Sequence, residues 1–381
     1  MRAAHALSVS SLIIFSLPVV SAQSATSRIV NAANSFLATL DDKQRQSVAF
    51  AFDDEQQRKR WSNFPTGVVT RGGISLKEMN SAQRSAAMAF LSSALSPRGF
   101  EKVQQIMEGD EVNKTNEANG GGRGGRGGDR GFNGRGAGPP PLDRVGDSPL
   151  TGRRSGGPPP GAGGGGLLFG RDLYYISIMG TPSEKNPWML QFGGHHLAIE
   201  YHDRGVITPT LTGAQPALYT INGKTVRPLG QENDKAVGLL DALNENQRKQ
   251  AVLNYRVPDL VLGPGQDGKT IQPEGLKASN MNEKQRALLL DVIGEWAGIV
   301  NENAATARMA ELKTDLNETW FAWSGPTTAM VGTNITAYYR IQGPHLVIEY
   351  APQQLGGDPA MHVHTMYRDP TNDYGRKLAA K

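Results

Sequence analysis

The chain repeats its own sequence in four blocks, and this repetition constrains its fold more than any other feature. Residues 193–201, GGHHLAIEY, return as QGPHLVIEY at 342–350. LDDKQR at 40–45 returns as LNENQR at 243–248, and MNSAQR at 79–84 returns as MNEKQR at 281–286. GAQPALYTI at 213–221 matches GGDPAMHVH at 356–364, so that Tyr219 and Ile221 align with His362 and His364. Four blocks in the same order predict an internally duplicated chain with two pseudo-symmetric halves, residues 23–235 and 236–381.

Each half is expected to begin with helices and to end with strands. Apolar residues at helical spacing indicate helices near 36–52, 80–94 and 98–107, and again near 239–255 and 282–311. Aromatic and β-branched runs at 172–180 and 318–325 indicate strands, followed by the HLxIEY segments and a third strand at 217–221 and 360–367. Asn222-Gly223 is typical of a tight hairpin turn. We therefore predict an α+β fold in which each half carries a small antiparallel sheet.

The N-terminus has the pattern of a secretory signal peptide over residues 1–22. Arg2 provides a positive charge, residues 12–20 are apolar, and Val20-Ser21-Ala22 resembles a cleavage site. The apolar run is short for a bilayer span, and no later segment is long enough, so no transmembrane segment is expected after cleavage. A retained N-terminal anchor is the alternative. We expect a secreted or periplasmic protein, and because the chain has no cysteine, neither disulfides nor thiolate metal sites can form.

A Gly/Arg/Pro-rich insert at 117–166 interrupts the first half only. With so few apolar residues it cannot bury enough surface to offset the entropy of ordering, so we expect a disordered loop. Its arginine–glycine repeats leave RNA binding as the alternative. The net charge of the chain is +4, and the seven arginines and three aspartates between Gly120 and Gly166 account for it. The remainder is close to neutral, which argues against a general nucleic-acid-binding surface.

The histidines suggest a metal site. His362 and His364 are two residues apart on an expected strand, so their side chains share a face and could bind one divalent ion. His196 and His345 occupy the same place in the two HLxIEY segments and are the next candidate ligands. Zinc fits imidazole ligands, whereas Met366 on the same face would favour copper.

Four carboxylates are candidates for the chemistry at such a site, as ligand, positioning partner or general base: Glu200, Glu349, Asp369 and Asp373. Other interpretations remain open for these residues. His196 and His345 could be buried strand histidines, the His362/His364 pair could be a surface feature or carry metal-free acid–base chemistry, and Glu200 and Glu349 could pair with arginines. His202 fits a surface position at a strand end.

Several well-known catalytic motifs are absent. The chain has no HExxH, GxSxG, Walker A or dinucleotide-binding fingerprint. Three kinds of function stay open. The first is a metal-dependent enzyme, in our interpretation a hydrolase acting on an unknown small-molecule or polymer substrate, with oxygen binding as the alternative if the ion is copper. The others are a non-catalytic metal carrier and a cell-surface interaction module that uses the Arg/Gly loop.

The segments NFPTG, RGG, MNSAQR, GGHHLAIEY, PHLVIEYAPQ and HVHTMYRDPTNDYG resemble those of the Domain of Unknown Function 3500 family. The resemblance covers nearly the whole chain after residue 22 except the insert, and the C-terminal run is its most specific part. It implies a secreted protein but carries no established activity or site.

Overall fold

The computed structural model describes residues 24–118, 168–202, 205–354, 357–375 and 377. The predicted signal peptide and almost all of the Gly/Arg/Pro-rich insert lie outside these residues. Within them, no helix is both long and apolar enough to cross a membrane.

The described part of the N-terminal half contains the α-helices α1 (Ala25–Ala38), α2 (Asp42–Val48), α3 (Glu55–Arg58), α4 (Ser81–Ala94) and α5 (Pro97–Ala118). Its strands are β1 (Ala49–Phe50), β2 (Ile74–Ser75), β3 (Tyr175–Met179), β4 (Met189–Gly194), β5 (Leu197–His202), β6 (Gly205–Thr212), β7 (Tyr219–Ile221) and β8 (Lys224–Val226). The C-terminal half contains helices α6 (Gly230–Asp241), α7 (Glu245–Ala251), α8 (Glu283–Ala297) and α9 (Glu302–Thr314). Its strands are β9 (Leu276–Lys277), β10 (Trp320–Ser324), β11 (Tyr338–Gly343), β12 (Leu346–Pro352) and β13 (Val363–Arg368). The boundary expected between residues 235 and 236 falls inside α6.

One 11-stranded mixed sheet runs through both halves, in place of the two separate small sheets that we predicted. Its order is β1-β3-β4-β5-β6-β13-β12-β11-β10-β9, and β2 pairs with β3. The halves join because β6 and β13 pair in antiparallel fashion, with Leu211 opposite Met366 and Thr210 opposite Tyr367. This pairing covers two strand edges that would otherwise expose unpaired backbone groups. The α+β class is confirmed, whereas the division into two separate antiparallel sheets was wrong.

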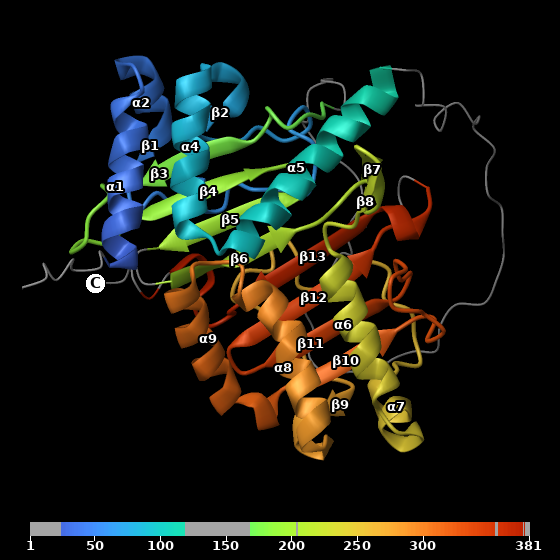
Figure 1. Ribbon diagram of the computed structural model, residues 1–381. Coiled ribbons are helices and arrows are strands. Elements are labelled where there is room, and N and C mark those ends of the chain that lie inside the picture. Colours follow the sequence, from blue (N-terminus) through green and yellow to red (C-terminus); the bar gives the residue numbers. More distant parts are fainter. Residues whose placement is uncertain (1–23, 119–167, 203–204, 355–356, 376, 378–381) are drawn as a thin grey trace, which may run out of the picture.

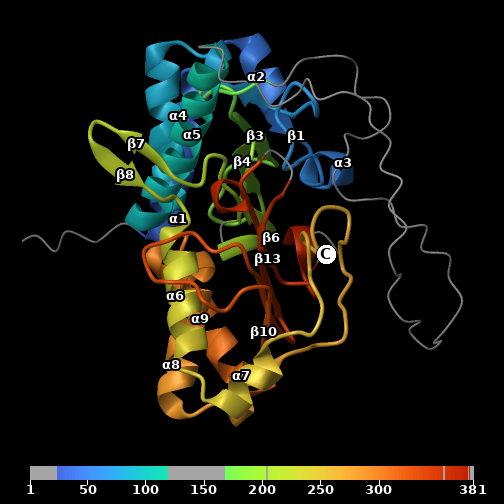
Figure 2. The ribbon, with the colours of Figure 1, turned by 90° about the vertical axis from the view of Figure 1, so that its right-hand side faces the viewer.

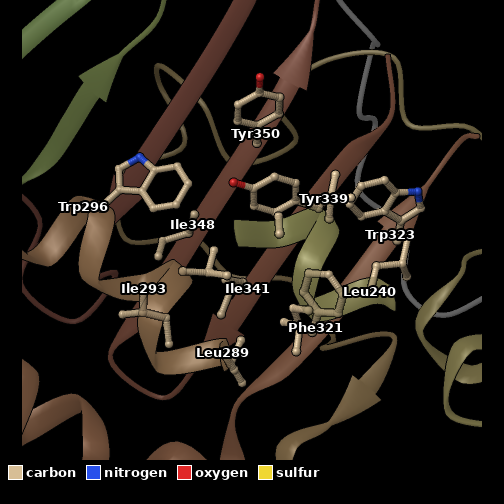
Figure 3. Packing of buried hydrophobic residues seen from close by; sticks show 14 of the residues in the cluster. Leu240, Leu289, Ile293, Trp296, Phe321, Trp323, Tyr339, Ile341, Ile348 and Tyr350 are labelled. Carbon is tan, nitrogen blue, oxygen red and sulfur yellow. The ribbon is translucent and has the colours of Figure 1, made fainter. Parts of the chain in front are cut away.

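The helices form a layer on one face of the sheet, while α3 and long loops cover the other face (Figures 1 and 2). Alternation along the strands explains this division. On β12, Leu346, Ile348 and Tyr350 enter the hydrophobic core beneath α6 and α8, where Ile293 and Trp296 also pack (Figure 3). On β5, Leu197, Ile199 and Tyr201 enter the corresponding core beneath α1 and α4. The predicted core faces of both HLxIEY strands are confirmed.

The repeated D/N-x-x-Q motifs are helix N-termini. Asp41 and Asn80 cap α2 and α4, each in a capping box closed by a glutamine three residues later. Asn244 and Asn282 cap α7 and α8 in the same way. The two glutamine amides of each half also bond each other. Gln83 Nε2 donates to Gln44 Oε1 over 2.7 Å, and Gln285 Nε2 donates to Gln247 Oε1 over 2.8 Å.

The segment at 217–221 does not form the third strand of the main sheet. β7 pairs with β8 in a separate two-stranded hairpin, and the predicted tight turn is confirmed by positive φ angles at Asn222 and Gly223. The main-sheet position is taken by β6, which sequence analysis missed because Pro209 interrupts its strand pattern. In sheet order the counterpart of β13 is therefore β6, so the alignment of Tyr219 and Ile221 with His362 and His364 was wrong.

Candidate metal centre

Three histidines from distant parts of the chain meet at the seam between the halves. His196 lies in the two-residue turn between β4 and β5, while His362 immediately precedes β13 and His364 is the second residue of that strand. Pairing of β6 with β13 brings the turn and the start of β13 together, and the isolated bridge between Ala214 and Val363 extends this contact.

The three Nε2 atoms converge on one point. They lie 2.9 Å apart between His196 and His362, 3.1 Å between His196 and His364, and 3.2 Å between His362 and His364. Among the described residues, these three form the one group of three or more His, Cys, Asp or Glu side chains close enough to hold a metal ion. No described carboxylate or fourth histidine joins them.

Local backbone and packing place His196 in this position. Its φ of 57° is left-handed, a conformation that histidine adopts more readily than most residues. Gly213 donates its N–H to His196 O over 2.6 Å. A Cβ on Gly213 would lie 3.2 Å from the His196 side chain and 2.7 Å from Val363 O, so the turn can approach β6 only because this residue is glycine.

Burial keeps the His196 imidazole neutral. The side chain is 1% exposed, and the pKa of His196 is well below its ordinary value because of burial and then because of the neighbouring histidines. A neutral ring offers the lone pair that a metal ion needs. His362 is also buried, and His364 is partly buried, so the centre is largely enclosed.

The Nδ1 atom of His364 faces polar groups from both loops that cover the sheet. Asp259 Oδ1 lies 3.5 Å away, on the loop of residues 253–275, and Asn63 Nδ2 lies 3.3 Å away, on the loop of residues 59–73. Although burial raises the pKa of the Asp259 carboxyl, hydrogen bonding and the charge of His364 outweigh it, and the net shift is downward. Asn63 Oδ1 has no partner, and a half-turn of this amide would present that oxygen to an Nδ1–H of His364.

A second polar cluster abuts His196. The ring of His195 packs on that of His196, with centroids 3.7 Å apart. His195 Nδ1 lies 2.7 Å from Asp110 Oδ1 on α5, and the hydroxyl of Tyr174 lies 2.8 Å from Asp110 Oδ2. All three side chains of this cluster, His195, Asp110 and Tyr174, are buried.

Sequence analysis did not single out Asn63, Asp259 or Asp110 as site residues. Nor did it single out His195, although the doubled histidine of GGHH contains it. Asp110 and Asp259 lie on a helix and in a loop with no motif that marks them, whereas Asn63 falls within NFPTG, a segment that was quoted only for the family resemblance.

The structure does not bring the fourth candidate ligand, His345, to this centre. His345 lies in the β11–β12 turn, the counterpart of the turn that carries His196. Its Nδ1 lies 3.1 Å from Thr371 Oγ1 and 3.9 Å from Asp369 Oδ1, and its Nε2 lies 4.0 Å from Asp315. Asp369, another candidate, therefore belongs with His345.

The remaining candidate carboxylates also bond elsewhere. Glu349 accepts the backbone N–H groups of Val261 and Leu262, each over 2.8 Å, and the Tyr338 hydroxyl over 2.6 Å. Asp373 bonds Arg368 Nη2 at 2.5 Å and accepts the N–H of Gly268 over 2.8 Å.

Of the four candidate carboxylates, Glu200 has an oxygen without a hydrogen-bond partner. Gln191 Nε2 donates to its Oε1 over 2.9 Å, but its buried Oε2 has no hydrogen-bond partner. Burial raises the pKa of Glu200 to about 8. The side chain is thus a protonated carboxyl at neutral pH, inside the protein.

Comparison with known proteins identifies the family but supplies no activity. No curated protein and no solved structure matches the chain. A family model described as "Protein of unknown function (DUF3500)" matches residues 22–376, nearly the entire sequence. The predicted resemblance is confirmed, and the chain belongs to the DUF3500 family.

Proposed function

We propose that this protein binds one divalent metal ion through His196, His362 and His364 and uses it to activate water for hydrolysis. The observation that carries the proposal is the convergence of three Nε2 atoms within 3.2 Å of one another, without a fourth protein ligand among the described residues. Structural zinc sites usually have four protein ligands, whereas catalytic sites have three and keep a position for water or substrate.

The spacing of the nitrogens favours zinc, or another ion of tetrahedral or octahedral preference, over copper(II). An ion about 2.1 Å from each nitrogen, a typical zinc–imidazole distance, would make N–metal–N angles of roughly 90–100°. In a square-planar site two of three nitrogens would lie opposite each other, roughly 4.2 Å apart. No pair here exceeds 3.2 Å. Met366, the residue that suggested copper, packs with Ala198 and Leu211 in a small apolar cluster.

Metal analysis tests the binding step. Protein purified without a histidine tag is stripped with a chelator, and zinc binding is measured by calorimetry and thermal shift. We expect one zinc per chain and a rise in Tm, because a ligand that binds only the folded state stabilises it. His196→Ala should abolish both effects, whereas His345→Ala, which removes a histidine outside the centre, should retain them. Equal zinc binding by wild type and His196→Ala would disprove the proposed centre.

A second experiment tests hydrolysis. The zinc-loaded protein and its His196→Ala variant are compared on activated ester and phosphoester probes, since the natural substrate, a small molecule or a polymer, is unknown. Turnover that requires both zinc and His196 supports a hydrolase. If the wild type binds zinc but hydrolyses the probes no faster than His196→Ala, the proposed hydrolase activity is refuted. The protein would then be a metal carrier, a function that also fits the enclosed ligands.

We also infer that the chain is exported and internally duplicated. Export is supported by the signal-like pattern of residues 1–22, and N-terminal sequencing of the mature protein should begin at Gln23. Duplication is supported by the matching element order of the halves and by their equivalent capping boxes. A mature protein that retains residues 1–22 would contradict export by cleavage.

A further inference from the structure

The loop of residues 253–275 covers the sheet on the face opposite the helices and carries a carboxylate to the metal centre (Figure 2). Asp259 Oδ1 lies 3.5 Å from His364 Nδ1, on the side of the ring away from the converging Nε2 atoms. The same oxygen accepts the N–H of Leu260 over 2.6 Å and Gln353 Nε2 over 2.7 Å. These bonds hold the Asp259 side chain in place.

A buried glutamate fastens this loop to the sheet. Glu349, on β12 and 0% exposed, accepts the N–H groups of Val261 and Leu262, two and three residues after Asp259. The hydroxyl of Tyr338 donates a third bond to Oε1 of the same carboxylate. Because two successive backbone groups are bound by one rigid side chain, the segment that carries Asp259 has little freedom to shift.

The corresponding position in the N-terminal half lacks this arrangement. Glu200 pairs with Gln191 across β4 and β5, as Glu349 pairs with Arg340 across β11 and β12. Yet Glu200 bonds the Gln191 side chain and leaves Oε2 without a partner. Of these two glutamates, Glu349 binds a loop, and that loop brings the carboxylate of Asp259 to the centre.

We propose that Asp259 is a positioning residue of the metal centre, which holds the Nδ1–H of His364 so that Nε2 faces the ion, and that Glu349 acts through the loop to keep Asp259 there. This inference rests on the proposed function. A carboxylate on the outer nitrogen fixes the tautomer of a metal-binding imidazole and makes its other nitrogen a stronger ligand. Loss of such a partner typically weakens metal binding by about 10- to 100-fold.

The experiment measures zinc affinity by competition with a chromophoric chelator, using the full chain. Asp259→Ala should weaken binding by about 10- to 100-fold, and Asp259→Asn should recover part of this loss, because the amide oxygen still accepts a hydrogen bond but carries no charge. Asp291→Asn is the control, since Asp291 is an exposed carboxylate on α8. Its affinity should equal that of the wild type.

Two further readouts separate positioning from a merely structural role. The absorption spectrum of the cobalt(II)-substituted protein reports ligand geometry, so it should change in Asp259→Ala but not in Asp291→Asn. Glu349→Gln should weaken zinc binding in the wild-type background and have a much smaller effect when Asp259 is already alanine, because the two residues act in series.

The outcomes distinguish this inference from the proposed function. If the wild type and Asp259→Ala bind zinc equally while His364→Ala does not, the metal centre stands and Asp259 has no positioning role. If the wild type itself binds no zinc, both proposals fail together. An unchanged cobalt spectrum in Asp259→Ala would also overturn the role assigned to Asp259.

Discussion

Replacement of Glu200 by glutamine should stabilise the protein, by an amount that grows with pH. The folded-state pKa is about 8, whereas the ordinary value for glutamate is 4.5. Between these values the unfolded chain has released the proton and the folded chain still holds it, so the free energy of unfolding falls as pH rises. At about 1.36 kcal/mol per pKa unit, the cost is about 3 kcal/mol at pH 7 and about 5 kcal/mol above pH 8. Glutamine cannot ionise and avoids this cost.

The surroundings of Glu200 support the substitution. Gln191 Nε2 can donate to the side-chain oxygen of a glutamine at position 200 as it does to Glu200 Oε1. The other terminal atom, Oε2 in glutamate or Nε2 in glutamine, lacks a hydrogen-bond partner in both proteins. The charged groups that act on Glu200 are Arg58, which lowers its pKa, and Asp373 and Asp267, which raise it. Arg58 keeps its bond to the backbone oxygen of Tyr374 in the variant.

Urea unfolding of metal-free protein at pH 5, 7 and 9 provides the measurement. We expect similar stability of wild type and Glu200→Gln near pH 5, and an advantage for the variant of about 3 kcal/mol at pH 7 that increases further at pH 9. The matched control is Glu349→Gln at the equivalent sheet position. It should be destabilising, since an amide group would face the N–H groups of Val261 and Leu262. A stability difference between wild type and Glu200→Gln that is independent of pH would refute the reasoning.

Four further substitutions test the core and the backbone of the centre. Gly213→Ala should reduce both zinc affinity and Tm, because the added Cβ would lie 2.7 Å from the backbone oxygen of Val363. Gly238→Ala in α6 is the control. Its added Cβ meets no atom within 4 Å, so it should stabilise the protein by about 0.5–1 kcal/mol. Lys102 forms an ion pair with the fully buried Glu232. Lys102→Met removes this partner, so the free energy of unfolding in urea should fall by about 3–5 kcal/mol. An unchanged free energy of unfolding would contradict a stabilising role for this ion pair. Leu289→Ala leaves a cavity under α8 and should cost about 2–5 kcal/mol in the same assay.

Local sequence patterns predicted much of the secondary structure and the division of the strand faces. Capping depends on residues three apart, so Asn80 and Gln83 could be recognised as a helix start from sequence alone. Alternation along a strand depends on residues two apart, so the core side of Leu346, Ile348 and Tyr350 was also predictable. Helix ends were predicted less well, because the helical pattern at 282–311 is divided into α8 and α9.

By itself the sequence established family membership, the α+β class and the pairing of His362 with His364. Only the tertiary structure decided which further histidine joins them. His196 and His345 occupy equivalent turns, and no local pattern distinguishes them as ligands. The difference arises because β6 pairs with β13 through residues more than 150 positions apart, which brings the turn of His196, and not that of His345, to the start of β13. Such long-range strand pairing depends on the whole sheet, so the cluster of three histidines becomes visible only in the folded chain.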